Sequence, residues 1–395
     1  MATRRQWHLS ALTALVGAAL LSACGGGGES GPTTTRIVIF GDSLSDMGAY
    51  TPATQIPLGQ AAGVAPFFGG KFTTNSHTGY TAASNSSTAN TWGEWVAARL
   101  GVAVTPHEVG FGPQSVKCPA AANPALAGSC TGYAQGGSRV TNPAGIGNPN
   151  GTGLNGASPT PMTRPMVRQV ADHLARFTGF DGGAIVFVYG GNNDVFIQFG
   201  SVAAGLPVAT AVANMQQAAN ELVALVKDQI VAKGASRVAV MNLADASATP
   251  GFRGLPAANK ALLGQLSAEF NTTLSAGLAG VAGVRMIDAR ALSASILASP
   301  ASFGFTNTTD AACDPAKIAA FTGGRVTDGS SLFCNGAAAS LFVAPVPNLN
   351  SIKAGASTST WLFADSVHPT TGGHKAFSDQ VITKLKEFDW IPQNQ

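Results

Sequence analysis

A serine, a histidine and an aspartate in this chain have the residue types and the spacing that acyl transfer requires. Ser43 lies in the run Phe40-Gly41-Asp42-Ser43-Leu44-Ser45-Asp46, directly after a short apolar segment that is typical of a buried parallel strand. Asp365 and His368 lie far downstream, three residues apart. A serine hydroxyl is a poor nucleophile until a base accepts its proton, and neutral histidine does so. We therefore predict that Ser43 is the nucleophile, His368 the base and Asp365 the carboxylate that orients it.

The tetrahedral intermediate of acyl transfer also needs hydrogen-bond donors for its oxyanion. We expect the backbone N–H of Ser43, at the start of a helix, to be one of them. Asn193, in Val188-Tyr189-Gly190-Gly191-Asn192-Asn193-Asp194, is the expected side-chain donor, and Gly137, in Tyr133-Ala134-Gln135-Gly136-Gly137-Ser138, offers a second backbone donor. In a sheet ordered 2-1-3-4-5 the first and third strands are neighbours, so Ser43 and Asn193 would meet at one crevice.

Acidic residues beside Ser43 raise the question of a metal site. Short acidic side chains at such a turn more often cap backbone N–H groups, and we favour this role for Asp42 and Asp46. Asp194 is likewise interpreted as structural, and Ser45 is the alternative nucleophile. Because no cysteine pair has the C-x-x-C spacing of a zinc site, we expect neither a metal nor another cofactor.

Alternating apolar runs and helical patterns predict the elements that must position these residues. Short strands that alternate with helices favour an α/β fold, a three-layer α/β/α sandwich around a five-stranded parallel sheet with right-handed crossovers. We expect the strands at Ile37–Phe40, Val102–Thr105, Ala184–Tyr189, Arg237–Leu243 and Val284–Ile287. We expect the helices at Thr91–Leu100, Pro165–Phe177, Ala209–Lys233, Asn259–Leu278 and Gly373–Phe388.

Three long insertions interrupt this alternation: Thr51–Asn90, Phe111–Thr163 and Ser302–Ser359. Loops of this length are usually functional or disordered, so we interpret them as walls and a lid above a substrate cleft, with surface decoration as the alternative. Their aromatic residues could line an acyl pocket or bury the undersides of the loops, and the sequence does not separate these roles. The residues in question are Phe67, Phe68, Phe303 and Phe305.

Four cysteines lie within two of these insertions. The local pairs Cys118–Cys130 and Cys313–Cys334 would each close a short loop rich in turn residues, and such loops gain stability from a disulfide. We favour these two pairings, with free thiols as the alternative. Disulfides would place the domain in an oxidising compartment.

The first residues of the chain have the features of an export signal. Arg4 and Arg5 precede the apolar stretch Leu9–Leu21, which is too short to span a bilayer but fits the core of a signal peptide. The run Leu21-Ser22-Ala23-Cys24 resembles the lipobox of bacterial lipoproteins, in which cleavage leaves a lipid-modified cysteine. An ordinary signal peptide cut near Ala23 is the alternative.

These features predict how the chain is organised. We expect a lipoprotein signal peptide at 1–23, a flexible tether at 24–35 and one catalytic domain at 36–395. Acylated Cys24 would anchor the protein to a membrane, and Gly25 rather than aspartate after it suggests the outer membrane, by the lipoprotein sorting pattern that this run resembles. We therefore expect the outer membrane or the cell surface, with a secreted or periplasmic protein as the alternative.

The charge of the chain argues against one class of partner. Only 11% of residues are charged, against about 25% in an average globular protein, and the net charge is +3. No basic patch is evident, so nucleic-acid binding has no support. We expect an ester or lipid substrate and infer no obligate protein partner.

Four motifs along the chain together resemble those of the GDSL esterases and lipases, also called SGNH hydrolases. They are Gly41–Asp46, Gly136-Gly137, Gly191–Asp194 and Asp365–His368. The resemblance implies a flavodoxin-like fold and assigns the roles given above to Ser43, Gly137, Asn193, Asp365 and His368. Within the family the chain is most similar to the bacterial phospholipase, haemolysin and autotransporter-esterase branch. That similarity is carried by Phe72-Thr73-Thr74-Asn75 before Trp92, and by Leu362–Asp365 before His368-Pro369-Thr370.

The resemblance implies an exported serine carboxylic-ester hydrolase, of the esterase, lipase or phospholipase kind, that works through an acyl-serine intermediate. Acyl transfer to an alcohol and deacetylation of cell-surface sugars are alternatives on the same fold. A surface-binding lipoprotein with inactive motifs is an alternative of another class. The G-x-S-x-G motif of the α/β-hydrolases is absent, which excludes that other lipase architecture.

Overall fold

The computed structural model describes residues 32–54, 69–76, 87–112, 115–146, 163–338, 340 and 348–394. The predicted signal peptide, Cys24, most of the predicted tether, Phe67 and Phe68 lie outside the described residues.

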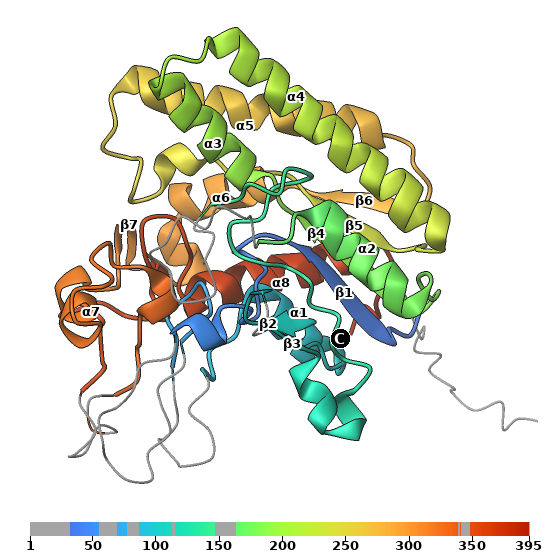
Figure 1. Cartoon of the computed structure of the whole chain (residues 1–395), viewed down its shortest axis with the longest axis horizontal. Coiled ribbons are helices and arrows are strands. Elements are labelled where there is room, and N and C mark those ends of the chain that lie inside the picture. Colours follow the sequence, from blue (N-terminus) through green and yellow to red (C-terminus); the bar gives the residue numbers. More distant parts are fainter. Residues whose placement is uncertain are drawn as a thin grey trace, which may run out of the picture.

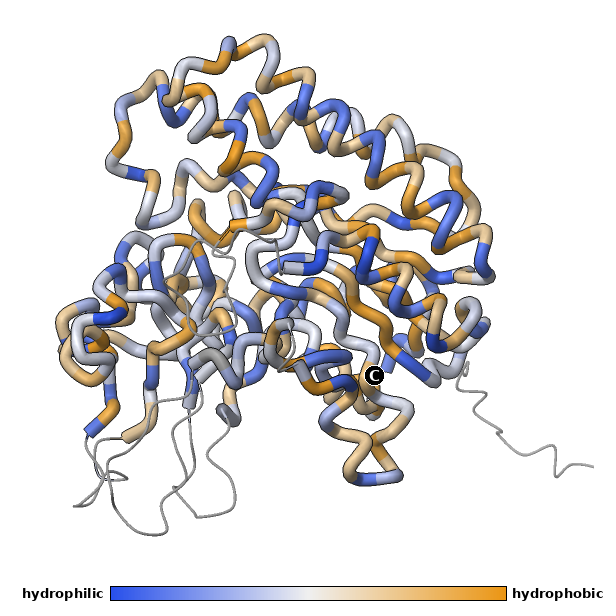
Figure 2. The backbone as a smooth tube through the Cα atoms, in the orientation of Figure 1, coloured by the Kyte–Doolittle hydropathy of each residue, from blue (hydrophilic) through white to orange (hydrophobic). Residues whose placement is uncertain are grey.

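A parallel sheet of four strands forms the centre of the fold (Figure 1). Its order is β1 (Arg36–Gly41), β4 (Ala184–Tyr189), β5 (Val238–Met241) and β6 (Val284–Ile287). Ile37–Phe40 of β1, and all of β4 and β5, are continuous apolar runs because both faces of the sheet are covered there, and Figure 2 shows these runs in the interior. The last strand, β6, includes the exposed Arg285. On β1, Val38 and Phe40 enter one core cluster, whereas Ile37 and Ile39 enter the other.

The predicted fifth strand at Val102–Thr105 is wrong. The edge of β1 is occupied instead by residues 131–133: Ile39 N–H donates to Thr131 O at 3.0 Å, and Tyr133 N–H donates to Ile39 O at 2.8 Å. Residues 105–107 lie outside this segment and pair with it at one isolated bridge, Pro106↔Gly132. At this bridge Gly132 N–H donates to Thr105 O at 3.0 Å and His107 N–H donates to Gly132 O at 2.7 Å.

Helices cover both faces of the sheet, as expected (Figure 1). One face packs against α2 (Met166–Phe177), α4 (Val208–Ala224) and α5 (Ala257–Leu278), and the other against α1 (Trp92–Leu100) and α8 (Thr371–Glu387). The five predicted helices are confirmed. The predicted helix at Ala209–Lys233 continues from α4 through a π-helical stretch, Leu225–Ile230, and a 3₁₀ turn, Val231–Lys233.

Three further helices were not expected from the sequence: α3 (Asn192–Ala203), α6 (Ala289–Ala298) and α7 (Pro315–Phe321). Among the described residues, two small sheets each pair a strand inside an insertion with a strand just outside it. One is an antiparallel pair of β2 (Glu108–Val109) and β3 (Val116–Lys117), and the other is a parallel pair of β7 (Asn307–Ala311) and β8 (Trp361–Phe363). β8 matters for the site because it leads directly into Asp365.

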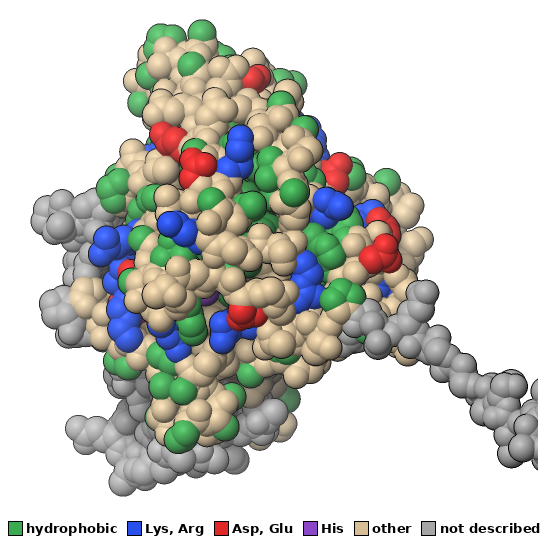
Figure 3. Space-filling view, turned by 90° about the vertical axis from the view of Figure 1, so that its right-hand side faces the viewer, with side chains coloured by type: hydrophobic (Ala, Val, Ile, Leu, Met, Phe, Trp, Pro, Cys, Tyr) green, Lys and Arg blue, Asp and Glu red, His purple; other side chains and the backbone are tan. Residues whose placement is uncertain are grey.

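The described parts of the insertions are ordered around two disulfides, which are the pairs favoured by the sequence. Cys118 is bonded to Cys130 and Cys313 to Cys334, with Cα–Cα distances of 5.3 and 5.6 Å. Figure 3 shows basic and acidic side chains interspersed over one face of the molecule. In the described part of the chain, no helix has both the length and the apolar character needed to cross a membrane.

Candidate active site

The end of strand β1 delivers Ser43 to the carboxyl edge of the sheet. Gly41, the last residue of β1, is paired with Tyr189 of β4, and a Cβ at Gly41 would lie only 2.2 Å from the Tyr189 carbonyl oxygen. Gln169 of α2 fixes this strand end, since it accepts from Gly41 N–H at 2.9 Å and donates to Gly41 O at 2.8 Å. Ser43 follows in a turn, not at a helix N-terminus as expected, and is partly exposed.

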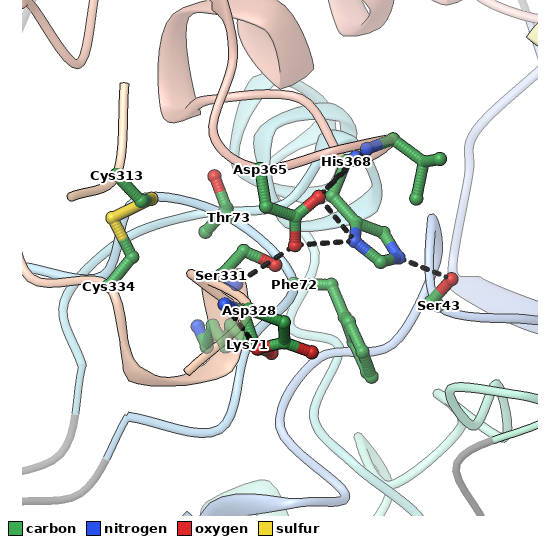
Figure 4. A network of polar contacts seen from close by, with 12 residues as sticks. Ser43, Lys71, Phe72, Thr73, Cys313, Asp328, Ser331, Cys334, Asp365 and His368 are labelled. Atoms are coloured by element: carbon green, nitrogen blue, oxygen red, sulfur yellow. Dashed lines mark hydrogen bonds and ion pairs between the residues drawn. A yellow bond between two sulfur atoms is a disulfide. The ribbon is translucent and has the colours of Figure 1, made fainter. Parts of the chain in front are cut away.

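Ser43, His368 and Asp365 form one continuous hydrogen-bonded chain (Figure 4). His368 Nε2 lies 2.9 Å from Ser43 Oγ. His368 Nδ1 lies 2.8 Å from Oδ2 and 2.9 Å from Oδ1 of Asp365. Because the ionised carboxylate can only accept, Nδ1 carries the proton and Nε2 presents its lone pair to the serine hydroxyl. The arrangement can therefore remove the proton from Ser43.

Backbone donors converge on the carboxylate of Asp365. Oδ1 accepts from the N–H of Val367 and of His368, at 2.9 and 2.8 Å, and Oδ2 accepts from Ser331 N–H at 2.9 Å. Burial by itself raises the pKa of this carboxyl group, but the neighbouring imidazole and these hydrogen bonds outweigh it, so the pKa of Asp365 lies well below its ordinary value. The carboxylate is thus ionised at neutral pH.

The three expected oxyanion donors line one cavity of about 320 Å³ that opens at Ser43. Asn193 lies in the first turn of α3, and its Nδ2 donates one hydrogen to Ser138 O at 2.8 Å, which leaves its second hydrogen for a ligand. Gly137 has a φ of +79°, and a Cβ there would collide with the Ile146 carbonyl oxygen. Among the described residues, the backbone N–H groups of Ser43 and Gly137 have no acceptor.

The aspartates beside the nucleophile cap backbone groups, as interpreted from the sequence. Asp42 accepts from Leu44 N–H, and Asp46 accepts from three backbone N–H groups, including that of Gly136 at 2.8 Å. Burial raises the pKa of Asp42 and of Asp46 to about 6, against the effect of these hydrogen bonds. Asp194 forms an ion pair with Arg139 at 2.8 Å and has a structural role.

Burial decides two further sequence interpretations, namely whether Ser45 could be the nucleophile and whether Phe303 and Phe305 line an acyl pocket. Ser45, the alternative nucleophile, is fully buried and accepts a hydrogen bond from Trp92 Nε1 at 3.2 Å, so it does not face the cavity. Phe303 and Phe305 pack in a small apolar cluster with Ile296 and do not line the cavities at Ser43. In the ranges that the structure describes, no group of three or more His, Cys, Asp or Glu is placed to hold a metal ion.

Sequence reasoning missed three residues that support the site. Gln169 holds the strand end, Ser331 donates to Asp365, and the ring of Phe72 packs against the imidazole of His368 with a centroid separation of 4.8 Å. Phe72 lies in a motif that carried the family resemblance, so a signal for it existed. Ser331 acts through its backbone N–H, which any residue but proline carries, so no side-chain pattern could indicate it.

A Ser–His–Asp chain at the carboxyl edge of a parallel sheet defines the class of proteins that activate a serine for acyl transfer. Residues 37–381 match the sequence model of the GDSL-like lipase/acylhydrolase family. The chain therefore belongs to this family, as the four motifs predicted. Membership of the family supports the hydrolysis of ester bonds as the activity of the protein.

The comparisons with solved structures include a member of the lipolytic protein G-D-S-L family from Veillonella parvula DSM 2008. It is 12% identical to this chain, with a TM-score of 0.35, and the alignment covers 89% of this chain and 99% of that one. Among the curated proteins, none matches this chain.

Proposed function

We propose that the protein is a serine carboxylic-ester hydrolase that works through an acyl-serine intermediate. The observation that carries this proposal is the continuous chain from Ser43 Oγ through His368 to Asp365, open to a cavity lined by N–H donors that have no acceptor in the described part of the chain. Membership of the GDSL-like lipase/acylhydrolase family supports it. Without the imidazole the hydroxyl would be a weak nucleophile, and without the N–H donors nothing in the site would stabilise the negative charge of the oxyanion.

In the acylation half of this mechanism, Ser43 Oγ forms a bond to the carbonyl carbon of the ester as its proton passes to His368 Nε2. The carbonyl π electrons move to oxygen, and the N–H groups of Ser43 and Gly137 with the amide of Asn193 stabilise that charge. When the electrons return, the bond to the alcohol oxygen breaks and the proton on His368 passes to the departing alcohol. The enzyme is left as an ester of Ser43.

In the deacylation half, water takes the place of the alcohol. His368 Nε2 accepts a proton from water as its oxygen bonds to the acyl carbon, and the second tetrahedral intermediate releases Ser43 with that proton. Throughout both halves Asp365 keeps the tautomer of His368 fixed and stabilises the imidazolium. The products are a carboxylic acid and an alcohol, and no cofactor takes part.

The test is labelling by a fluorophosphonate probe together with hydrolysis of p-nitrophenyl butyrate. Wild-type protein should be labelled and should turn the ester over, whereas Ser43→Ala should do neither. Ser45→Ala is the matched control, because that hydroxyl lies two residues away and is buried. Retained labelling in the Ser43→Ala variant would reject Ser43 as the nucleophile, and a wild-type protein inert to the probe would favour the inactive binding lipoprotein.

We also propose that the protein is exported and anchored through a lipidated Cys24. The support is the charged, apolar and lipobox-like order of residues 1–24, together with two disulfides in the folded domain. The test is metabolic labelling with an alkyne-modified fatty acid in a bacterial host. Label should enter the wild-type protein and be lost in Cys24→Ser, and a wild-type protein that takes up no label would point to an ordinary signal peptide.

A further inference from the structure

Two cavities meet at Ser43, and the second has the larger share of polar wall. One, of about 130 Å³, extends between α6, β8 and α8 and is mostly apolar, with Leu44, Phe196, Leu292, Ile296, Leu362 and Phe363 among its walls. The other, of about 320 Å³, combines apolar residues such as Phe72 and Val326 with polar and charged ones, Arg325, Thr327, Asp328 and Ser330. Ser43, Asn193 and His368 line both cavities, so a carbonyl group at the nucleophile would send one substituent into each.

We infer that the apolar cavity is the acyl-binding pocket and that it selects acyl chains of about six carbons; this inference rests on the proposed function. An acyl chain is hydrocarbon beyond its carbonyl, so it gains most from the more apolar cavity, whereas polar groups on the alcohol side of an ester can pair with the polar and charged residues that only the other cavity offers at Arg325–Ser330. An engineered apolar cavity of about 150 Å³ holds a benzene molecule, which has six carbons. A pocket of about 130 Å³ therefore has room for about five carbons beyond the carbonyl.

Helix α6 supplies the wall of this pocket that can be altered most simply. Leu292 and Ile296 are four residues apart and so lie on the same face of the helix. Leu292 lines the pocket and is only partly buried, which makes it tolerant of substitution. Leu297 of the same helix is also partly buried in the adjoining apolar cluster but does not line the pocket, so it is the matched control.

The experiment is a series of p-nitrophenyl esters from acetate to dodecanoate, measured beside fluorophosphonate labelling of Ser43. In wild-type protein, kcat/KM should rise by up to about fourfold per methylene as far as hexanoate, and should then fall. Leu292→Trp should lower the ratio of hexanoate to acetate turnover at least tenfold, and Leu292→Ala should move the optimum to a longer chain. Leu297→Ala should keep the wild-type optimum.

Labelling separates the two ways in which this experiment could fail. A flat series, an optimum at acetate or an unchanged ratio in Leu292→Trp, with Ser43 labelled normally, would overturn the assignment of the pocket and leave the proposed function standing. Protein that neither hydrolyses any ester nor reacts with the probe would overturn both.

A separate observation concerns the Cys313–Cys334 disulfide, which joins the two segments that hold Asp365 (Figure 4). Cys313 N–H donates to the carbonyl of Ala364, the residue before Asp365, at 2.9 Å. Cys334 follows the 3₁₀ turn Ser331–Phe333, whose first N–H donates to Asp365 Oδ2. These contacts are shielded from solvent, because the residues that make them, Ser331, Cys334 and Ala364, are fully buried.

The structure assigns this disulfide a positioning role: it holds Ser331 N–H against the carboxylate that orients His368. Without the covalent link, the turn at Ser331 and the segment before Asp365 are joined by non-covalent contacts alone. The Cys118–Cys130 disulfide offers a matched comparison, because the hydrogen bonds of its cysteines go to His107, Thr105, Ala121 and Arg176 and not to the triad.

The test compares two double variants, Cys313→Ser with Cys334→Ser and Cys118→Ser with Cys130→Ser. Active sites are first counted by fluorophosphonate titration, so that unfolded molecules do not enter kcat. The first pair should lower kcat per titrated site at least tenfold with KM within twofold, and the second pair should leave kcat per site within twofold. Equal losses in both pairs, or a loss only in the number of sites, would overturn the positioning role.

A single substitution tests the same contact without touching the disulfide. Ser331 is the first residue of its 3₁₀ turn, where proline is tolerated, and Ser330 before it has an extended backbone that proline allows. Ser331→Pro therefore removes the N–H that donates to Asp365. We expect at least a tenfold lower kcat per titrated site, and an unchanged value would contradict the role given to this contact.

Discussion

Replacing Asp365 by asparagine should reverse the tautomer of His368 and abolish most activity. Oδ1 of Asp365 accepts from two backbone N–H groups, those of Val367 and His368, whereas Oδ2 accepts from one, that of Ser331. An asparagine oxygen will therefore occupy the Oδ1 position, and its NH₂ group will lie where Oδ2 faces His368 Nδ1. To accept from that NH₂ group, Nδ1 must lose its hydrogen, and the proton moves to Nε2.

The size of the effect follows from that tautomer. With a hydrogen on Nε2, the imidazole has no lone pair for Ser43, which lies 2.9 Å away. In a serine protease the same substitution lowers kcat about 10⁴-fold while the geometry is kept. We expect a loss of 10³ to 10⁴ here, which corresponds to about 4 to 5.5 kcal/mol in the activation free energy.

The assay is kcat for p-nitrophenyl butyrate per folded molecule, with circular dichroism and thermal unfolding as controls for the fold. KM should change little, because the substitution acts on proton transfer and not on binding. A folded Asp365→Asn variant with more than a tenth of wild-type kcat would refute the reasoning, since His368 would then accept the proton of Ser43 without help from the carboxylate.

Three further predictions follow from the geometry of the site and the sheet. Asn193→Ala should lower kcat by about 10² to 10³ with little change in KM, as loss of one oxyanion donor does. Steady-state kinetics would test this, and a higher KM with an unchanged kcat would contradict it. Burial lowers the pKa of His374 from 6.5 to about 4. Between these pH values the histidine is protonated in the unfolded chain but neutral in the folded protein, so stability is lost as the pH falls from 6.5 towards 4. Between pH 6.5 and 5 this group alone should lower the unfolding free energy by about 1.6 kcal/mol. Urea titrations should find that the unfolding free energy of His374→Gln depends less on pH by that amount, and a pH dependence parallel to that of wild type would contradict the prediction. Gly41→Ala should destabilise the fold by about 1 to 3 kcal/mol or more, because its Cβ would lie 2.2 Å from the Tyr189 carbonyl oxygen; an unchanged melting temperature would contradict that contact.

The sequence predicted the parts of the fold that are encoded by apolar pattern. The strands from Ala184 and Val284 and the five long helices have continuous or periodic apolar residues, and each forms where expected. Val102–Thr105 has the same apolar character but no strand forms, because residues 131–133 already pair with β1. Competition between two segments for one strand edge is a tertiary effect that local pattern does not record.

The site was predictable to the extent that its chemistry resides in side chains. Ser43, Asp365 and His368 were chosen by residue type and spacing, and the structure brings them into hydrogen-bond contact. The contributions of Ser331 and Gly41 come from the backbone, and the hold of Gln169 on the strand end depends on a helix docked from far along the chain. Such contacts appear only when the fold is assembled.

The most direct test of the central claim is to trap the enzyme while it hydrolyses p-nitrophenyl butyrate. Acid quenching during turnover, followed by peptide mass spectrometry, would locate any acyl group held covalently by the protein. The mechanism predicts a butyryl ester on Ser43, with more of it accumulating when deacylation is slowed. Acyl groups on another residue, or turnover with no acylated peptide at any stage, would contradict it.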